Sequence, residues 1–259
     1  MEVSGPAIIT GAAGGIGRAI ALRFVDFKCR NLTLVDQNAD GLAETKDLIF
    51  KQDPSVVVHT ISCDLTADGA PEMVVRESFE KFNALYHLVN CAGTPGGFAT
   101  SQETDIDMFD RVQSLNVRAA WLLQKAAIQR MLTQNAINGE RGSIVNIGSL
   151  VSHVGLPALS AYTTSKHALL GMTRSEAVDF ASEGIRINLV APGLVSTDLG
   201  RAIPAEIRDH HLTPVLKRTP MGRFATPQEV ANCVAFLSSQ LAAYITGINL
   251  PIDGGYSAM

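Results

Sequence analysis

The sequence predicts an α/β protein with a three-layer, doubly wound fold around a seven-stranded parallel sheet. Short apolar runs alternate with longer helical stretches almost from one end of the chain to the other. The runs are continuously apolar, which is typical of strands that are buried on both faces. Only 18% of the residues are charged, below the ~25% of an average soluble domain. Alternation of this kind indicates parallel strands joined by helices that cover both faces of the sheet.

The predicted elements follow this alternation in order. The strands are seven apolar runs: Ala7–Thr10, Leu32–Val35, Val56–Ile61, Leu85–Val89, Ser143–Ile147, Ile185–Val190 and Ile248–Ile252. The helices span residues 15–27, 41–52, 68–82, 104–134, 160–183 and 227–239. A proline-rich stretch at 194–226 interrupts the alternation, and we interpret it as a substrate-binding lobe because loops of this length are usually functional. One domain over residues 1–259 accommodates the whole pattern.

Composition argues against several classes of protein. The chain has a net charge of −4, so it has no basic field to attract nucleic acid or anionic lipid. Its four cysteines are far apart and form no C-x-x-C pair, which argues against a disulfide scaffold and fits a reducing, cytoplasmic compartment. No stretch reaches 18 uninterrupted apolar residues, so we expect no membrane span. His210 and His211 are adjacent and cannot share a helix face, so we expect no metal there.

The first predicted strand leads into a glycine-rich turn that opens a helix, Thr10-Gly11-Ala12-Ala13-Gly14-Gly15-Ile16-Gly17. Glycine permits a positive φ and a close approach to a pyrophosphate, and the helix N-terminus offers free N–H groups to phosphates. Asp36 ends the second strand, 19 residues after Gly17 and near the ~20 expected for a carboxylate that binds the adenosine ribose. The spacing T-G-x-x-x-G-x-G differs from the usual G-x-G-x-x-G fingerprint.

Three polar residues indicate a reacting centre. Tyr162 and Lys166 are four residues apart and share a helix face, so the ammonium is expected to lower the pKa of the phenol, which is near 10 for free tyrosine. Ser149 follows the fifth predicted strand, at the sheet edge where ligands bind. We predict that Tyr162 is the general acid/base at the substrate oxygen and that Ser149 donates a hydrogen bond to that oxygen.

Taken together, these motifs resemble the classical short-chain dehydrogenase/reductase family, over essentially the whole chain. The ordered matches are the glycine turn, Asp64-Leu65, Asn90-Cys91-Ala92-Gly93, Asn116, Ser149, Tyr162-Thr163-Thr164-Ser165-Lys166, Pro192-Gly193 and Asp253-Gly254-Gly255. The resemblance implies a Rossmann fold, hydride transfer between a carbinol carbon and a nicotinamide, and no need for a metal. It also implies a homo-oligomer, a dimer or a tetramer, built from the helices at 104–134 and 160–183.

The resemblance assigns further roles to single residues. Asn116 matches the family position that supports a water-linked proton relay from Lys166, which also holds the nicotinamide ribose with Tyr162. For Asn90, a role in tying strands together is equally open. The other cofactor contacts that the resemblance implies are Gly11, Gly15, Ile16, Gly17, Asp36, Asp64, Leu65, Asn90, Ala92, Gly93, Pro192, Gly193, Val195 and Thr197.

The predicted cofactor is NAD. Asp36 would accept hydrogen bonds from both ribose hydroxyls of NAD and would repel the 2′-phosphate of NADP. NADP-preferring relatives carry a basic residue just before the second motif glycine or just after the second strand, where this sequence has Gly14 and Gln37.

The predicted substrate is a small molecule, a hydrophobic secondary alcohol or its ketone. His153 and Leu194 are expected at the mouth above Ser149 and Tyr162, among mostly apolar neighbours, although a surface role for His153 stays open. One alternative is an NADPH-dependent reductase of a carbonyl such as a 3-oxoacyl thioester. The carrier protein would then need a basic patch, for which the candidates are Arg201, Arg208, Lys217, Arg218 and Arg223. A non-catalytic NAD-binding scaffold is a third reading, against which the presence of Tyr162 and Lys166 argues.

Overall fold

Seven parallel strands form one sheet in the order β3-β2-β1-β4-β5-β6-β7. The structure is a computed structural model, and it describes residues 1–197 and 204–258. The sheet contains all seven predicted strands, which confirms the predicted fold class. The strands are β1 (Ala7–Thr10), β2 (Asn31–Asp36), β3 (Val57–Ser62), β4 (His87–Asn90), β5 (Gly142–Ile147), β6 (Ile185–Pro192) and β7 (Asn249–Ile252).

The strand order reverses between β1 and β4, which lie side by side in the sheet. Ile8 of β1 pairs with Thr33 of β2 on one side and with Leu88 of β4 on the other. In doubly wound sheets, the binding crevice opens at the carboxyl ends of the strands where the order reverses. The end of β1, which leads into the glycine turn, therefore lies at the expected binding edge.

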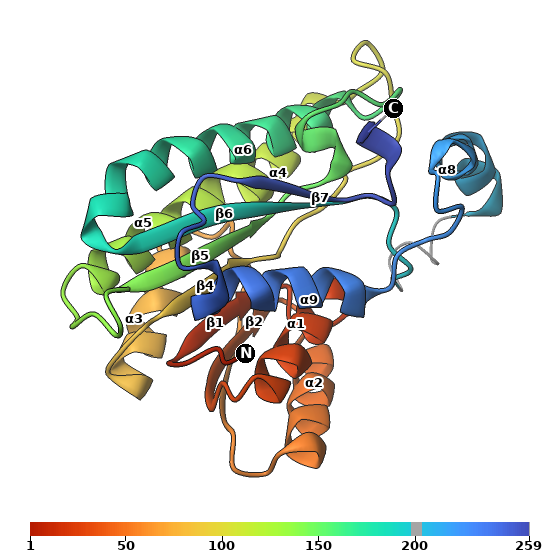
Figure 1. Ribbon diagram of the computed structural model, residues 1–259. Helices are drawn as coiled ribbons and strands as arrows, with labels where there is room; N and C mark the ends of the chain where they lie inside the picture. Colours follow the sequence, from red (N-terminus) through yellow and green to blue (C-terminus); the bar gives the residue numbers. More distant parts are fainter. Residues whose placement is uncertain (198–203, 259) are drawn as a thin grey trace.

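Helices cover both faces of the sheet (Figure 1). On one face α1, α2 and α9 enclose a core that includes Phe24 and Val234, and on the other α3, α5 and α6 enclose a core that includes Leu123. Neighbouring strand residues divide between the two cores, Ile9 into the first and Ile8 into the second, which explains the continuously apolar runs. The helices are α1 (Gly15–Asp26), α2 (Ala39–Gln52), α3 (Ala70–Phe82), α4 (Ile106–Gln113), η1 (Ser114–Ala119), α5 (Ala120–Met131), η2 (Leu150–Ser152), α6 (Ser160–Phe180), η3 (Ala181–Glu183), α8 (Ala205–Arg218), α9 (Pro227–Ser238), η4 (Gln240–Ala242) and η5 (Tyr256–Ala258).

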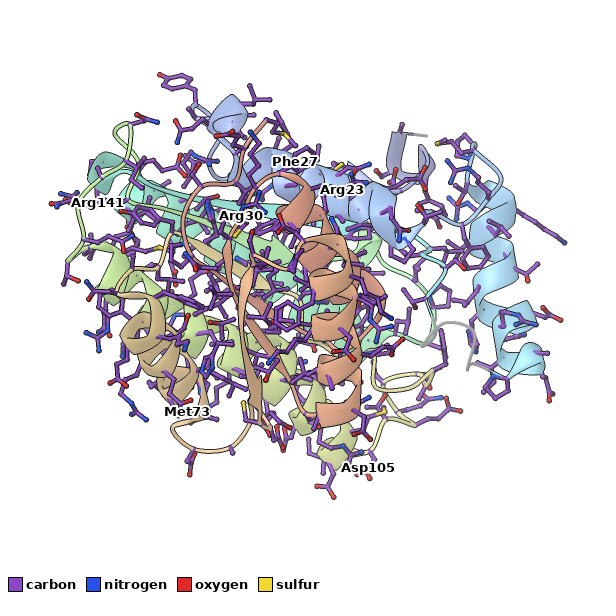
Figure 2. The ribbon with its side chains drawn as sticks, turned by 90° about the horizontal axis from the view of Figure 1, so that it is seen from below. Arg23, Phe27, Arg30, Met73, Asp105 and Arg141 are labelled. Carbon is purple, nitrogen blue, oxygen red and sulfur yellow. The ribbon has the colours of Figure 1, made fainter. Side chains whose placement is uncertain are left out.

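Local side-chain contacts stabilise several helix ends. Asp105, labelled in Figure 2, accepts a hydrogen bond from the N–H of Asp107 at the start of α4. Thr226 and Glu229 form a reciprocal capping box at the start of α9. At the carboxyl end of α1, the guanidinium of Arg23 lies 5.7 Å from the centre of the Phe27 ring (Figure 2).

The helix predicted over 104–134 is not continuous. It consists of α4, the π-helix η1 and α5. A π-helical turn carries an extra residue and changes which side chains share a face, and such turns are frequent at functional sites. The buried Asn116 lies within this turn.

The predicted lobe at 194–226 contains a helix that the sequence pattern missed, α8. Its apolar residues are few and Pro214 lies inside it, so its periodicity is weak. Figure 1 shows α8 standing apart from the layers, and Val215 joins it to a small core with Leu150 and Tyr256. Residues 198–203 of the predicted lobe lie outside the described residues. Within the described part of the chain, no helix has the length and apolar character that crossing a membrane requires.

Candidate active site

A cleft of about 950 Å³ opens at the carboxyl ends of the strands. We call its two parts the acidic end, with Arg18, Asp36, Asp40, Glu44 and Asp64, and the tyrosine end, with Ser149, Tyr162 and Lys166. The glycine turn also lines this cleft. The predicted cofactor contacts that line the cleft are Gly11, Gly15, Ile16, Gly17, Asp36, Asp64, Leu65, Ala92, Gly93, Tyr162, Lys166, Pro192, Gly193, Val195 and Thr197.

The glycine turn lets a ligand approach the backbone closely. Gly11 has a φ of 68° and Gly15 a φ of 52°, both in the left-handed region that other residues avoid. A Cβ at Gly17 would collide with the carbonyl oxygen of Gly11. Gly14 precedes α1 without a side-chain cap, and a Cβ there would meet nothing within 4 Å. The N–H groups at the start of α1 therefore fit the pyrophosphate of a dinucleotide.

Thr10 ties the end of β1 to the segment after β4. Its hydroxyl accepts hydrogen bonds from the N–H groups of Cys91 (2.9 Å) and Ala92 (3.0 Å). The two segments that flank the reversal of strand order are thereby fixed relative to each other.

Asp36 at the acidic end is held in place by the backbone. One of its carboxylate oxygens accepts a hydrogen bond from the N–H of Ala13 (3.1 Å) and the other from the N–H of Asn38 (3.0 Å). Each oxygen keeps a lone pair for a further donor such as a ribose hydroxyl. The carboxylate of Asp64 accepts bonds from the N–H and the hydroxyl of Thr66 (2.8 and 2.7 Å), which hold its pKa below the usual range.

Ser149, Tyr162 and Lys166 come together at the tyrosine end, as the sequence predicts. Ser149 follows β5 as the N-cap of η2, and its side chain lies beside Tyr162, whose pKa it lowers. Lys166 lies one turn after Tyr162 on α6, with its Nζ 5.5 Å from the centre of the phenol ring. That Nζ donates a hydrogen bond to the carbonyl oxygen of Ile147 (2.8 Å) at the end of β5.

Burial decides the ionisation of Tyr162 and Lys166. It raises the pKa of Tyr162, against the lowering effect of the Ser149 side chain, and it lowers the pKa of Lys166 to about 8. The pKa of Tyr162 is thus raised in this structure, and its lowering by Lys166 stays a prediction. Lys166 is buried, and its ammonium lies over the ring and binds the Ile147 carbonyl, while Tyr162 is half-buried in the cleft wall.

Comparison with known proteins places this cleft in a family. A family model described as Enoyl-(Acyl carrier protein) reductase matches residues 11–257. The 2-(R)-hydroxypropyl-CoM dehydrogenase of Xanthobacter autotrophicus is 38% identical over 257 residues, which cover 98% of each chain. The chain belongs to the classical short-chain dehydrogenase/reductase family.

Solved members of the family share the whole fold. Levodione reductase is 30% identical with a TM-score of 0.91, and the match covers 100% of this chain and 99% of that one. NAD⁺-bound xylitol dehydrogenase is 31% identical with a TM-score of 0.87, covering 96% and 98%. Related structures hold either NAD⁺ or NADP. The chain is thus an oxidoreductase of CH–OH and carbonyl groups that acts on small molecules with a nicotinamide cofactor.

Asn116 of this short-chain dehydrogenase/reductase holds the segment after β4. Its Oδ1 accepts a hydrogen bond from the N–H of Thr94, and its Nδ2 donates to the carbonyl of Thr94 (both 2.9 Å) and to the hydroxyl of Ser165 (3.0 Å). A Cβ at Gly93 would lie 3.1 Å from Asn116 Oδ1 and 3.5 Å from Lys166 Nζ. The amide and the ammonium therefore approach the same point of the cleft wall.

Asn90 is not among the cleft-lining residues, so its predicted cofactor contact is wrong for the side chain. Its Nδ2 donates to Asn146 Oδ1 (2.8 Å), and the Nδ2 of Asn146 donates to Gln124 (3.0 Å) and Thr173 (2.9 Å). This buried network joins β4 and β5 to α5 and α6, which is the strand-tying role that the sequence left open.

Neither His153 nor Leu194 is among the residues that line the cleft, and their substrate contacts stay predictions. The His153 ring lies 3.1 Å from the side-chain amide of Asn249 in β7. Leu194 packs against the small core that contains Leu150 and Tyr256. Both side chains follow strands that end at the cleft, but the small core and β7 draw them away from it.

Two of the five basic residues expected to form a carrier-protein patch already contact other side chains of this chain. Arg223 forms an ion pair with Glu229 (2.7 Å), and the Arg218 guanidinium lies 5.0 Å from the centre of the Tyr256 ring. Arg201 lies outside the described residues.

Sequence reasoning missed a contact at the acidic end. Arg18 follows the glycine turn and forms an ion pair with Glu44 of α2 (2.7 Å). The two residues are 26 positions apart on different helices, so no local pattern could have paired them.

Proposed function

We propose that this short-chain dehydrogenase/reductase interconverts a hydrophobic secondary alcohol and its ketone with NAD as the cofactor. One observation carries the proposal: Ser149, Tyr162 and Lys166 line one end of a cleft that a backbone-held Asp36 lines at the other end. A dinucleotide that joins the two ends would present its reactive ring to the tyrosine.

The proposed catalytic residues are Ser149, Tyr162, Lys166 and Asn116. In the oxidation, the Tyr162 oxygen removes the hydroxyl proton of the substrate, and the Ser149 hydroxyl donates a hydrogen bond to the same substrate oxygen. In the reduction, the phenol of Tyr162 returns the proton to that oxygen. When bound, the nicotinamide supplies the hydride chemistry. Lys166 would hold the nicotinamide ribose and take part, with Asn116 and water, in returning protons to solvent.

The glycine turn is the proposed pyrophosphate site, because its open backbone and the start of α1 match an anion. Asp36 would bind the adenosine ribose. The segments after β3 and β4 would contact the adenine and its ribose, and the segment after β6 would contact the nicotinamide. The residues assigned to these segments are Asp64, Leu65, Ala92, Gly93, Pro192, Gly193, Val195 and Thr197.

The preference for NAD follows from the fixed position of Asp36. Its carboxylate is anchored at both oxygens, so it cannot swing away from a 2′-phosphate that carries nearly two negative charges. The ribose hydroxyls of NAD are donors and would complete its hydrogen bonding.

The proposed substrate side lies between the segment after β4 and α8. The rings of Phe98 and His211 stack with their centres 4.4 Å apart and link these two segments. Pro95 and Leu115 line the cleft on this side. This mostly apolar setting favours a hydrophobic alcohol over a polyol.

The test is a screen of secondary alcohols and ketones with each cofactor. Purified protein is assayed by the absorbance of reduced nicotinamide with cyclic and aliphatic secondary alcohols, with polyols, and with the matching ketones, using NAD(H) and NADP(H) separately. We expect turnover of the apolar alcohols and ketones with the NAD couple. Higher kcat/KM with the NADP couple would overturn the cofactor assignment, and activity on polyols alone would overturn the substrate class.

We also propose that the one-domain chain forms a homodimer or homotetramer through the helices of one sheet face. Trp121 of α5 and Val178 of α6 are 43% and 81% exposed, more than apolar side chains of this size usually are in a monomer. Light scattering coupled to size-exclusion chromatography measures the mass directly. A single monomer peak at micromolar concentration would contradict the proposal.

A further inference from the structure

The acidic end of the cleft holds a single cation among the described residues that line it. The carboxylates of Asp36, Asp40, Glu44 and Asp64 line the same end as Arg18, and the other lining cation, Lys166, belongs to the tyrosine end. Among the described side chains of the cleft wall, Arg18 is therefore the one that could attract a phosphate at this end.

Two of the three nitrogens of the Arg18 guanidinium, Nε and Nη2, are bonded to protein acceptors. Its Nη2 lies 2.7 Å from a carboxylate oxygen of Glu44 and donates to the carbonyl of Ala13 (2.5 Å), while its Nε donates to the hydroxyl of Thr45 (3.0 Å). Thr45 is fully buried, and its hydroxyl donates in turn to the carbonyl of Ala12 (2.8 Å). Arg18 is thus fastened to the glycine turn and to α2 at the same time.

Ala13 connects this arginine to Asp36. Its N–H donates to the carboxylate of Asp36, and its carbonyl accepts from Arg18. Asp36 and the guanidinium are consequently held on the two sides of one residue of the turn. Within residues 1–197 and 204–258, Glu44 is the one charged partner of Arg18.

We propose that Glu44 is a second determinant of cofactor choice, which keeps the guanidinium of Arg18 from binding the 2′-phosphate of NADP. This inference rests on the proposed preference for NAD and adds a residue to it. The Glu44 side chain is 62% exposed, so its own repulsion of a phosphate is well screened by water. Its effect therefore comes through Arg18: the carboxylate binds Nη2 and offsets the charge of the guanidinium, so a phosphate gains less from the N–H donors that remain. Specificity then comes from withholding a favourable contact as well as from the repulsion by Asp36.

The experiment compares Glu44→Ala with wild type, alone and combined with Asp36→Asn. The readouts are the ratio of kcat/KM for NADP to that for NAD, and the affinities for 2′,5′-ADP and 5′-ADP by calorimetry, which need no turnover. We expect Glu44→Ala alone to raise the ratio about threefold, because Asp36 still repels the phosphate. When Glu44→Ala is added to Asp36→Asn, we expect the ratio to rise about tenfold above that of Asp36→Asn alone. The affinity for 2′,5′-ADP should rise by the same factor.

Two further variants show whether the gain passes through Arg18. Asp40→Ala removes a carboxylate from the same wall but leaves the Arg18–Glu44 pair intact, and it should raise the ratio less than twofold. Adding Arg18→Met to the double variant should abolish the gain. An equal gain in Asp40→Ala, a gain that survives Arg18→Met, or an unchanged ratio in the folded double variant would overturn the role of Glu44. A wild-type enzyme that prefers NADP would instead overturn the proposed function, so the two failures are distinct.

Discussion

The two ends of the cleft are fixed by different means. At the tyrosine end, Lys166 and Asn116 are only 5% and 1% exposed, and each is hydrogen-bonded to backbone atoms of a neighbouring segment. At the acidic end, the Glu44 partner of Arg18 is 62% exposed and its ion pair is open to water. Water can replace a lost partner at an exposed site, whereas a buried group that loses its partner bears the full cost of desolvation.

This contrast separates catalysis from selection. Changes at the tyrosine end should alter turnover and the free energy of unfolding strongly. Changes at the acidic end should alter which cofactor is used and leave the fold nearly unaffected. Each of the following measurements tests one side of that contrast.

The largest effect is expected for Tyr162→Phe. Removal of the phenolic hydroxyl eliminates the proposed general acid/base, so kcat should fall by about 10²- to 10⁴-fold. Cofactor affinity, measured by fluorescence titration, should fall only a few-fold, because one hydrogen bond to the nicotinamide ribose is lost while Lys166 and the ring stay in place. Tyr86→Phe, which removes an exposed hydroxyl bonded to the Asn135 carbonyl, serves as the control with normal turnover. Turnover of Tyr162→Phe within a few-fold of wild type would refute the mechanism.

The second effect concerns stability and pH at Lys166. Because burial lowers its pKa to about 8 in the folded protein from 10.5, the charged form opposes folding at neutral pH. This cost is fully present below pH 8 and fades as the pH rises toward 10.5. The free energy of unfolding of wild type, relative to Lys166→Met, should therefore rise by about 2–3 kcal/mol between pH 7 and pH 10.

Urea unfolding of both proteins at the two pH values measures this difference. Lys81→Met, at an exposed position in the last turn of α3, is the matched control and should show no comparable change. A difference between wild type and Lys166→Met that does not vary with pH would mean that Lys166 titrates normally in the fold.

The third effect is expected for Asn116→Ala. The substitution removes three hydrogen bonds and leaves the N–H and the carbonyl of Thr94 without these partners, at a cost of about 1–3 kcal/mol of unfolding free energy. Thermal unfolding checks this cost, and the pH profile of kcat checks the proposed proton relay. An altered profile with unchanged stability would assign Asn116 to the relay alone, against the structural role seen here.

The smallest effect on the protein is expected for Asp36→Asn. The amide oxygen can still accept a backbone hydrogen bond, so the melting temperature should stay within a few degrees of wild type. Loss of the negative charge should raise the ratio of kcat/KM for NADP to that for NAD about tenfold. A clear drop in stability without a change in the ratio would contradict the division of roles between the two ends.

Much of the fold and the site could be predicted because the signals are local. The continuously apolar runs predict strands buried on both faces, and all seven lie in the sheet. The glycine turn, Asp36, Ser149 and the Tyr162–Lys166 pair sit at strand or helix ends whose position follows from the alternation of elements. Parallel strands bring their carboxyl ends to one edge, so residues far apart in sequence meet there.

Other features could not be predicted because they depend on contacts between distant segments. The side-chain amide of Asn90 donates a hydrogen bond to Asn146 of β5. The His153 ring contacts the side-chain amide of Asn249 in β7. The helix α8 has a weak periodicity that Pro214 interrupts, so packing around Val215 rather than local preference identifies it.

The sequence by itself determined the order of the elements, the turn that matches a pyrophosphate, and the residue types at the tyrosine end. These follow from the period of the apolar residues and from glycine and polar residues at element ends. The tertiary structure alone decided the pKa values of Tyr162 and Lys166 and the ion-pair partner of Arg18. Burial, which no pattern of spacing reports, raises the pKa of Tyr162 and lowers that of Lys166. The packing of α1 against α2 joins Arg18 to Glu44, because a partner on another helix is set by the fold and not by distance along the chain.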